Sequence, residues 1–463
     1  MKKYNMLFVF VIALCSLLPA LINAQWLETT IPAGSGPRVL VWNSKINKVY
    51  CANWSSNNVT VIDGQINSVI RTITVGSMPS ALVWNSQNNK IYCSNMYSDN
   101  VTVIDGQTDS VIKTITVGAF PWPLVWNSLN NKIYCAMAHS NNVTVIDSQT
   151  DSVITTIAVG TYPTTLMWNS QNNKIYCSNQ NSNNVTVIDG QTNSVIITIP
   201  MGINPFQLVW NSQNNKVYCS NGNGITVING QSDSVITTII AGHGGLVWNS
   251  QNNKVYCANG SGNNVIVIDG QSDSVITTIA VGSYPTYLMW NSQNNKVYCA
   301  NAGVFPNNND STVSVIDGQS DLVITTITVG IWPRAFCWNS LQNRVYVANY
   351  RSATVSVIRD SIISGIEENH QPLTANRFSL DLYPNPAKTY FTIRFSQTLN
   401  QVQGDKCVVK MFDVTGKAVK EILRFAQNDN TMRISLEGIN NGVYFVTIQT
   451  DNYQETKKLL LIK

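Results

Sequence analysis

Short apolar runs separated by polar turn residues recur along most of the chain. In residues 79–118 the runs are ALVW, KIYC, VTVI and SVIKTITV, with Asn, Ser, Asp and Gly between them. Runs rich in Val, Ile, Thr and Tyr with such boundaries are typical of β-strands joined by tight turns. None of them has the i, i+3, i+4 apolar spacing of an amphipathic helix. We therefore expect each unit to be a meander of four antiparallel strands.

The first strand of each unit is apolar on both faces. In residues 81–84 alternate side chains point to opposite faces, yet all of them (Ala-Leu-Val-Trp) are apolar, so each face needs a covering layer. The fourth strand is mixed, with Lys113, Thr114 and Thr116, as expected at a rim that faces solvent. Units stacked radially around an axis meet both requirements, which predicts an all-β fold, the β-propeller.

The tripeptide Trp-Asn-Ser marks eight copies of the unit. It begins at Trp42, Trp84, Trp126, Trp168, Trp210, Trp248, Trp290 and Trp338, with spacings of 42, 42, 42, 42, 38, 42 and 48 residues. A period of roughly 40 residues indicates a propeller or a solenoid. We expect these Trp side chains to pack between blades. The stretch Asn-Ser-Gln-Asn-Asn-Lys that contains the motif is expected to be a turn with an exposed Lys.

The two ends of the repeat region favour a closed ring over a linear solenoid. Residues 26–34, WLETTIPAG, resemble a fourth strand such as ITTIAVG at 154–160, yet they precede the first unit. The last unit ends with a third strand at Thr354–Ile358 and the short SIISGI. The N-terminal segment is therefore predicted to complete the last blade, because closure removes exposed sheet edges. This gives eight blades. Seven remains the alternative if the last unit, where Arg344 and Arg359 break the pattern, caps the ring.

The repeats also resemble a known family. VYVANYRSATVSVI at 345–358, and fourth strands followed by Val-Gly and then Pro, as in Val281, Gly282 and Pro285, are similar to the YVTN-family β-propellers. The resemblance covers residues 26–365 and implies the fold but no single activity, because this fold hosts enzymes and binding proteins alike. Some propellers of this kind are lyases, lactonases or quinoprotein dehydrogenases. No residues that match such an active site are recognisable here.

The N-terminus predicts export. Residues 1–24 combine Lys2 and Lys3, an apolar stretch from Met6 to Leu21, and Ala24 before Gln25. A basic start, a short apolar core and a small residue at the end are typical of a secretory signal peptide. No other segment reaches the ~18 consecutive apolar residues of a spanning helix, so the mature chain is expected to have no transmembrane segment.

A second β-rich module follows residue 378. Residues 366–378 are a polar linker, and the runs YFTIRF, CVVKMFDV, MRISL, VYFVTIQT and KKLLLIK in 379–463 predict a small sandwich of about seven strands. The module resembles the C-terminal sorting domain of the type IX (Por) secretion system of Bacteroidetes-type bacteria. The residues that carry this resemblance are Tyr383, Pro384, Asn385, Pro386, Asp413, Gly416, Gly442 and Tyr444.

That resemblance implies a cellular location and a partner. The type IX machinery would recognise the C-terminal module, after export to the periplasm, and the protein would be secreted or attached to the outer-membrane surface. Whether the module is then removed stays open. The region 25–365 has 15 basic and 15 acidic residues and no basic patch, so nucleic acid is excluded as a partner. We expect a monomer.

The cysteines do not form a disulfide framework. Seven of the ten occupy one position in the second strand of successive units, namely Cys51, Cys93, Cys135, Cys177, Cys219, Cys257 and Cys299. Equivalent positions in neighbouring blades lie too far apart for bridging, so we expect buried free thiols that pack as small apolar groups. They have no paired Cys or His nearby, which argues against a metal site. No cofactor is expected.

Few residues suggest catalysis or ion binding. The sequence has no Gly-x-Ser-x-Gly, HExxH or glycine-rich phosphate loop. His139 and His243 stand alone in loops, where each is either a base or ligand or an isolated side chain. The turn Asp105–Ser110 and its counterpart Asp269–Ser274 present oxygen atoms that suit Ca²⁺, although their spacing is not that of an EF-hand. We favour a tight turn in which Asp and Ser side chains bond the backbone.

The copies differ mainly in two sets of loops. The loops between second and third strands, and those between one unit and the next, vary in sequence and emerge on the same face of an up-and-down ring. Aromatic groups with a few polar residues are typical of binding pockets. The candidate ligand-binding residues on this face are Trp54, Tyr97, Phe120, Trp122, Tyr162, Phe206, Tyr284, Trp332, Arg334, Tyr350 and Arg351.

These residues favour a non-enzymatic binding propeller whose ligand is a glycan, a peptide or a protein. No catalytic residue is proposed. Two alternatives stay open: a propeller enzyme of the lyase, lactonase or quinoprotein kind, and a structural component of the cell surface.

Overall fold

A computed structural model describes residues 22–304, 310–363, 380–383, 387–395, 406–413, 418–425, 431–449 and 454–461. Within these residues the chain consists of β-strands and a single 3-10 turn, η1 (Gly260–Gly262). The chain forms two compact units, which divide between residues 364 and 365. Residues 1–21 of the expected signal peptide and the whole expected linker lie outside the described residues.

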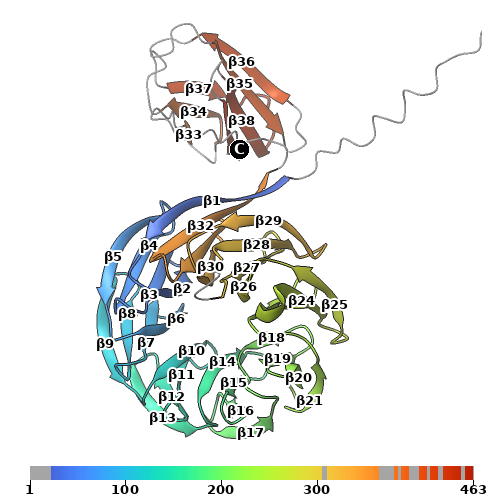
Figure 1. Cartoon of the computed structure of the whole chain (residues 1–463). Helices are drawn as coiled ribbons and strands as arrows, with labels where there is room; N and C mark the ends of the chain where they lie inside the picture. The colour runs from blue at the N-terminus through green and yellow to red at the C-terminus, as the bar shows by residue number, and fades with distance from the viewer. Residues whose placement is uncertain are drawn as a thin grey trace, which may run out of the picture. The chain divides into compact units, whose positions relative to one another are not determined.

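Eight four-stranded antiparallel sheets are arranged radially around a common centre (Figure 1). Blades 1 to 4 are β2 (Pro37–Asn43), β3 (Lys48–Asn53), β4 (Asn58–Asp63), β5 (Ser68–Thr74); β6 (Pro79–Asn85), β7 (Lys90–Asn95), β8 (Asn100–Asp105), β9 (Ser110–Thr116); β10 (Pro121–Asn127), β11 (Lys132–Met137), β12 (Asn142–Asp147), β13 (Ser152–Ala158); and β14 (Pro163–Asn169), β15 (Lys174–Asn179), β16 (Asn184–Asp189), β17 (Val195–Pro200).

The remaining blades continue the same order around the ring. Blades 5 to 8 are β18 (Leu208–Asn211), β19 (Lys216–Asn221), β20 (Gly224–Asn229), β21 (Val235–Ile239); β22 (Leu246–Asn249), β23 (Lys254–Asn259), β24 (Asn264–Asp269), β25 (Val275–Ala280); β26 (Pro285–Asn291), β27 (Lys296–Asn301), β28 (Thr312–Asp317), β29 (Leu322–Thr328); and β30 (Pro333–Asn339), β31 (Arg344–Asn349), β32 (Thr354–Ile363), β1 (Ile22–Pro32).

The N-terminal strand closes the ring. β1 pairs antiparallel with β32, with Ile31 opposite Val355 and Trp26 opposite Arg359, and the blue and orange ribbons run side by side in Figure 1. The predicted closure and the eight blades are confirmed. β1 begins at Ile22, four residues before the predicted strand and inside the expected signal peptide.

The last unit closes the ring and does not cap it, which corrects the seven-blade alternative. Arg344 holds both carboxylate oxygens of Glu28 on β1, with Nε and Nη2 donating at 2.7 and 2.6 Å. Arg359 donates to the same carboxylate at 3.2 Å. The two arginines that interrupt the repeat pattern are therefore the partners of the N-terminal strand. Burial alone would raise the pKa of Glu28, but the bonds and charges of both arginines outweigh it and lower this pKa.

The hydrophobic core lies between the blades. Tyr50, Val59 and Val61 of blade 1 pack against Leu82 and Ile91 of blade 2, and the same arrangement repeats around the ring. The second and third strands are almost entirely buried, whereas the fourth strands are largely exposed. The Trp side chains of the motif are partly buried and pack against these clusters.

The ring cysteines belong to this core. All seven repeat positions, and Cys337 as well, are buried free thiols. Burial raises the pKa of each thiol, for example that of Cys219 and Cys257 to about 12. The expectation of buried, unbridged thiols is confirmed for these residues, and Val347 fills the same buried position in blade 8.

The motif asparagines link each blade to the next. Trp84 Nε1 donates to Asn89 Oδ1 of its own blade at 3.2 Å, and Asn43 Nδ2 of blade 1 donates to the same oxygen at 2.8 Å. This arrangement recurs at every junction, and Asn339 Nδ2 of blade 8 completes it by donating to Asn47 Oδ1 of blade 1 at 2.7 Å. The Trp-Asn-Ser motif thus builds a closed ring of polar contacts as well as a packing surface.

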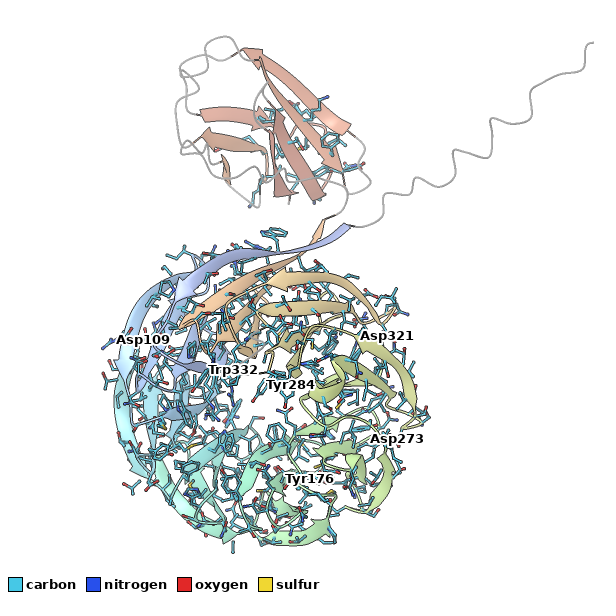
Figure 2. All side chains as sticks on the ribbon, viewed as in Figure 1. Asp109, Tyr176, Asp273, Tyr284, Asp321 and Trp332 are labelled. Carbon is cyan, nitrogen blue, oxygen red and sulfur yellow. The ribbon has the colours of Figure 1, made fainter. Side chains whose placement is uncertain are left out.

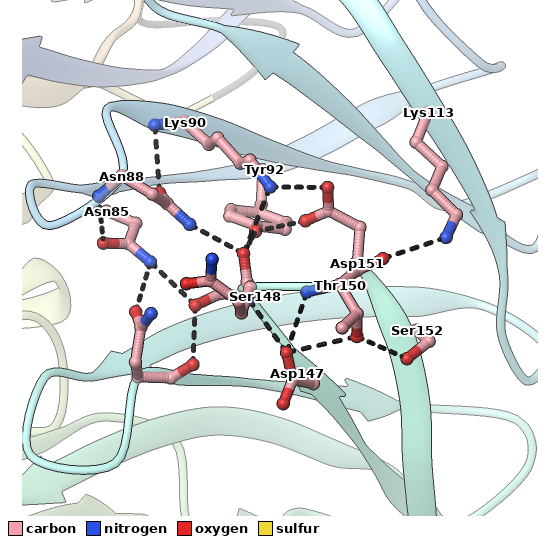
Figure 3. A network of polar contacts seen from close by, with 12 residues as sticks. Asn85, Asn88, Lys90, Tyr92, Lys113, Asp147, Ser148, Thr150, Asp151 and Ser152 are labelled. Atoms are coloured by element: carbon pink, nitrogen blue, oxygen red, sulfur yellow. Dashed lines mark hydrogen bonds and ion pairs between the residues drawn. The ribbon is translucent and has the colours of Figure 1, made fainter.

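A second polar link occupies the opposite side of each motif turn. Lys90 Nζ and Tyr92 Oη of blade 2 both donate to the Asp151 carboxylate of blade 3, each at 2.6 Å (Figure 3). The Lys90 side chain is 15% exposed. The prediction of an exposed Lys was therefore wrong, because the neighbouring blade covers its ammonium group. Equivalent ion pairs join Lys48, Lys174, Lys216 and Lys254 to an Asp of the next blade.

These contacts also explain the turn that was considered for Ca²⁺. In the turn Asp269–Ser274, Asp269 Oδ1 accepts backbone N–H bonds from Gln271 and Ser272 at 2.9 and 2.7 Å. This is the favoured tight-turn arrangement. The second carboxylate, Asp273, accepts bonds from Lys216 Nζ and Tyr218 Oη of the preceding blade at 2.8 and 2.6 Å.

The junction between blades 7 and 8 uses a different residue. Asp360 stands in β32 where six of the other blades have a turn glycine and blade 3 has Ser148, since its N–H donates to Asn343 O as Gly64 N–H does to Asn47 O. Its carboxylate accepts bonds from Lys296 Nζ at 2.6 Å and Asn291 Nδ2 at 2.6 Å. Gln25 Nε2 on β1 adds a third bond at 3.1 Å. Both charged side chains are 0% exposed.

The C-terminal unit is a small two-sheet structure. One sheet has the order β33-β34-β37 and the other β36-β35-β38-β39. The seven strands are β33 (Leu380–Tyr383), β34 (Tyr390–Phe395), β35 (Lys406–Asp413), β36 (Ala418–Phe425), β37 (Thr431–Ser435), β38 (Gly442–Gln449) and β39 (Gln454–Leu461). The five predicted runs correspond to β34, β35, β37, β38 and β39. The described core includes Val409, Leu436, Val446 and Leu459.

Some residues of the sorting motif can be placed. Asp413 at the end of β35 lies opposite Tyr444 of β38, and Tyr444 Oη donates to Asn440 O at 2.8 Å. Gly442 begins β38 and Tyr383 ends β33. Pro384, Asn385, Pro386 and Gly416 lie outside the described residues. No helix among the described parts of the chain is long and apolar enough to cross a membrane.

Candidate functional site

The two variable loop sets contact each other at one face of the ring. Phe120, in the loop before blade 3, donates its N–H to Asp99 Oδ1 of blade 2 at 3.0 Å. Its carbonyl accepts the N–H of Ala138 of blade 3, also at 3.0 Å. This loop is thus held between the second-to-third-strand loops of two blades, and equivalent bonds at Tyr162 and Tyr284 place both loop sets on one surface.

Several of these loops hold a bulky residue in a left-handed backbone conformation. The φ angles of Phe120, Tyr162, Tyr284 and Trp332 are 64°, 56°, 50° and 60°. Large side chains rarely adopt this conformation, which costs on the order of 1–3 kcal/mol. The hydrogen bonds from neighbouring loops hold it in place, as when Tyr284 N–H donates to Asn263 Oδ1 at 2.9 Å. Figure 2 shows Tyr284 and Trp332 toward the inner margin of the ring, whereas Asp109, Asp273 and Asp321 lie toward the outer rim.

One row of aromatic rings spans blades 2 to 4. Tyr97 meets Phe120 edge-on with ring centroids 5.3 Å apart, and Phe120 stacks on His139 at 4.0 Å. His139 in turn lies 6.1 Å from the Tyr162 ring. Tyr97 is 61% exposed, so this row is open to solvent. His139 is held by ring stacking within an aromatic row.

A second group lies at blade 8. Trp332 and Tyr350 meet edge-on with centroids 5.3 Å apart. The guanidinium of Arg351 lies 4.9 Å from the Trp332 ring, and that of Arg334 lies 5.6 Å from the Tyr350 ring. Arginine over an aromatic face is an attractive arrangement. In this arrangement the N–H groups at the edge of the guanidinium remain directed away from the aromatic face.

Arg38 lies beside Trp54 and Trp122 of the loop face, and the sequence did not single it out. Its Cζ lies 3.9 Å from the Trp54 ring and 5.2 Å from the Trp122 ring, so it reaches from blade 1 toward blade 3. Burial, and then the charge of Arg334, lower the pKa of Arg38 to about 10. Within the described ranges neither arginine has an ion pair or a conventional hydrogen bond. Arg38 follows Pro37 and Arg334 follows Pro333. Alignment of the two repeats would therefore have revealed that the arginines occupy equivalent positions in the first strands of their blades.

Other predicted residues lie apart from these groups. Phe206 is half-buried, and its carbonyl accepts hydrogen bonds from the Thr165 and Ser178 hydroxyls at 2.5 and 3.1 Å. It therefore connects its loop to the neighbouring blade 4. Tyr284 is 42% exposed. Among the residues that the structure describes, no ring contact involves either of them. His243 is exposed and likewise lies outside the aromatic groups.

The described residues contain no group of three or more His, Cys, Asp or Glu side chains that could hold a metal ion. The loop face carries aromatic surfaces and guanidinium groups. Such groups contact a ligand through flat apolar faces and through N–H donors.

Two protein families match parts of the chain. Residues 381–463 match the secretion system C-terminal sorting domain, and residues 22–156 match the seven-bladed β-propeller lactonases. The second match spans β1 and most of blades 1 to 3. No curated protein matches the sequence.

Solved structures share the propeller region. The computationally designed Ika8 protein is 15% identical with a TM-score of 0.60, over 72% of this chain and 99% of that chain. Sqt1 of Saccharomyces cerevisiae is 11% identical with a TM-score of 0.62, over 73% and 99%. Hydrazine synthase of Kuenenia stuttgartiensis is 19% identical with a TM-score of 0.52, over 72% and 97%. At these identities the similarity shows the fold alone.

The family matches and the eight sheets agree with the two resemblances that the sequence suggested. The C-terminal match implies handling by the type IX machinery and export to the cell surface or beyond. The chain is a β-propeller protein with a C-terminal sorting domain of the type IX secretion system.

Proposed function

We propose that the ring is a non-enzymatic binding module, which the sorting domain delivers to the outside of the cell. The observation that carries this proposal is the convergence of Trp54, Trp122, Trp332 and Tyr350 with Arg38 and Arg334 on one face. Clusters of partly exposed aromatic side chains with a few charged groups are typical of binding sites.

The loop backbone supports this proposal. Strained conformations persist where surrounding structure holds them, and they cluster at ligand sites. Here four bulky residues are strained in equivalent loops, while the second and third strands of the blades hardly vary. A rigid ring that presents held aromatic side chains loses little side-chain freedom when it binds a ligand.

The test is binding by the secreted full-length protein to arrays of glycans, peptides and surface proteins. The paired change Trp54→Ala and Trp122→Ala should weaken any specific binding at least tenfold, because central aromatic contacts are typically worth 2 kcal/mol or more, roughly. Leu129→Ala is the matched control, since Leu129 is 66% exposed in a turn on the opposite face. Unchanged binding in the tryptophan variant, with an unchanged melting temperature, contradicts the proposal.

A lactone hydrolase is the second candidate. The match of residues 22–156 to the propeller lactonases favours it. Turnover of a lactone series by the purified protein, reduced in the His139→Ala variant, would support this activity. No turnover across the series would contradict it.

We also propose that cleavage after Ala24 releases the mature protein. Such cleavage keeps Gln25 and Glu28, whose side chains bind Asp360 and Arg344 across the closure. N-terminal sequencing of the exported protein should begin at Gln25, and a start beyond Glu28 would contradict this. Fractionation of cells and medium distinguishes attachment to the surface from release.

A further inference from the structure

The variable loops and the starts of the first strands, together called the mouth of the ring, carry an excess of positive charge. The variable loops and the starts of the first strands contain three arginines, at 38, 334 and 351, and two acidic residues, Asp99 and Asp310. Both carboxylates are engaged by loop backbone: Asp99 accepts the N–H of Phe120 at 3.0 Å and Asp310 that of Ser283 at 2.7 Å. The region 25–365 as a whole has 15 basic and 15 acidic residues, so this excess of one positive charge is local.

Two of the arginines, Arg38 and Arg334, have no carboxylate partner among the described residues. Arg38 and Arg334 begin the first strands of adjacent blades, and their charges are close enough that Arg334 lowers the pKa of Arg38. Like charges held together in a partly buried place are unfavourable. Elsewhere the ring pairs such groups, as Arg344 with Glu28. An anion at the mouth would relieve the repulsion, and the planar guanidinium fork matches a carboxylate in a bidentate geometry.

The surroundings of the two guanidinium groups are aromatic and hydroxylic. Trp54 and Trp122 flank Arg38, and Tyr350 and Trp332 flank Arg334. A pyranose ring packs the C–H groups of one face on an aromatic ring and keeps its hydroxyls at the edge for hydrogen bonds. Aromatic platforms beside arginine donors thus fit a sugar that bears a carboxylate.

We propose that the mouth of the propeller binds an acidic saccharide, with the uronate carboxylate held between Arg38 and Arg334 and the sugar faces on Trp54 and Trp122. This inference rests on the proposed binding function and narrows its ligand class. An acidic peptide would satisfy the arginines alone. The two tryptophan rings beside Arg38 favour the saccharide.

The experiment compares four probes on the full-length exported protein by calorimetry: an oligogalacturonate, its carboxyl-reduced neutral counterpart, polyaspartate and sulfate. We expect the oligogalacturonate to bind at least tenfold more tightly than the other three. Arg38→Gln and Arg334→Gln should each weaken its binding by about 10- to 100-fold, as expected for loss of a charge-assisted hydrogen-bond pair. Arg71→Gln, a change of the same kind on the exposed rim of blade 1, should leave it unchanged.

Each outcome has a separate meaning. If polyaspartate binds as tightly as the oligogalacturonate, the saccharide class is wrong while the binding function stands. If the neutral saccharide binds equally well and the arginine variants are unaffected, the role of the guanidinium pair is wrong. If none of the probes binds and the arrays also give no ligand, the proposed binding function fails with it. Arg38→Lys should recover less than half of the lost affinity, in logarithmic terms, because an ammonium group cannot hold both oxygens of the carboxylate in parallel.

Discussion

Replacement of Asp360 by Asn should destabilise the ring strongly, since it leaves a buried ammonium group without a counter-charge. Lys296 and Asp360 are both 0% exposed, and the same carboxylate binds Asn291 and Gln25. Removal of one partner of a buried ion pair typically costs about 3–5 kcal/mol. In a domain of this size such a loss lowers the melting temperature by roughly 5–10 °C.

The chain provides its own comparison for this change. Asp151→Asn removes the same charge at another junction, but the Lys90 side chain is 15% exposed and can reach water. Blade 4 already carries Asn193 at that position, where it accepts bonds from Lys132 and Tyr134 at 3.1 and 2.7 Å. We expect Asp151→Asn to cost about 1 kcal/mol, a typical value for one hydrogen bond.

The assay is urea unfolding of the full-length protein, followed by tryptophan fluorescence, with thermal scans in parallel. The double variant Lys296→Met with Asp360→Asn should regain at least half of the lost stability, because no charge then remains buried. The reasoning is refuted if Asp360→Asn lowers the free energy of unfolding no more than Asp151→Asn does, while the slope of that free energy against urea concentration stays the same. It is also refuted if the double variant is less stable than Asp360→Asn alone.

Three further predictions concern other contacts. Glu28→Gln should lower the melting temperature at pH 7, because the arginines lower the pKa of Glu28 and its charge then stabilises the folded ring. This difference should shrink as the pH is lowered through the depressed pKa of Glu28, since the stabilising effect is lost when the carboxylate is protonated. A difference that stays constant down to the most acidic pH at which the ring is folded contradicts this. The eight buried ring thiols should react with a thiol reagent at pH 8 only after unfolding, because burial raises their pKa; rapid labelling of the folded ring would show that blades open locally. Tyr92→Phe should cost about 1–2 kcal/mol in urea unfolding, since it removes one bond to Asp151 and keeps the Lys90 pair; Tyr97→Phe, on an exposed ring, is the control, and equal losses would contradict the assignment.

Much of the fold follows from patterns that are local along the chain. The four runs in 79–118 became β6 to β9 with boundaries shifted by two residues at most. The N-terminal WLETTIPAG segment became the outer strand of blade 8 because it has the pattern of a fourth strand and no unit precedes it. The thiols were recognised as core residues because they recur at one position of the apolar second strand.

Other features could not be predicted from local patterns. Lys90 stands in a polar turn, which indicates exposure, yet the Asp that binds it lies 61 residues later on the next blade. Asp360 replaces a turn glycine, and its partner Gln25 is 335 residues away. Arg38 was missed because it is a single charged residue in an apolar strand. Its place in the candidate binding site depends on Trp122 and Arg334, which come from other blades.

The sequence alone therefore determined the repeat, the strands within it, the closure of the ring and the sorting domain. These depend on the alternation of side chains along each strand and on motifs that are contiguous in the chain. The tertiary structure decided which polar groups are paired with each other, because closure brings every blade beside a neighbour. Among the described residues, Arg38 and Arg334 are left close to each other with no carboxylate partner, which is the physical basis for the anionic ligand that we propose there.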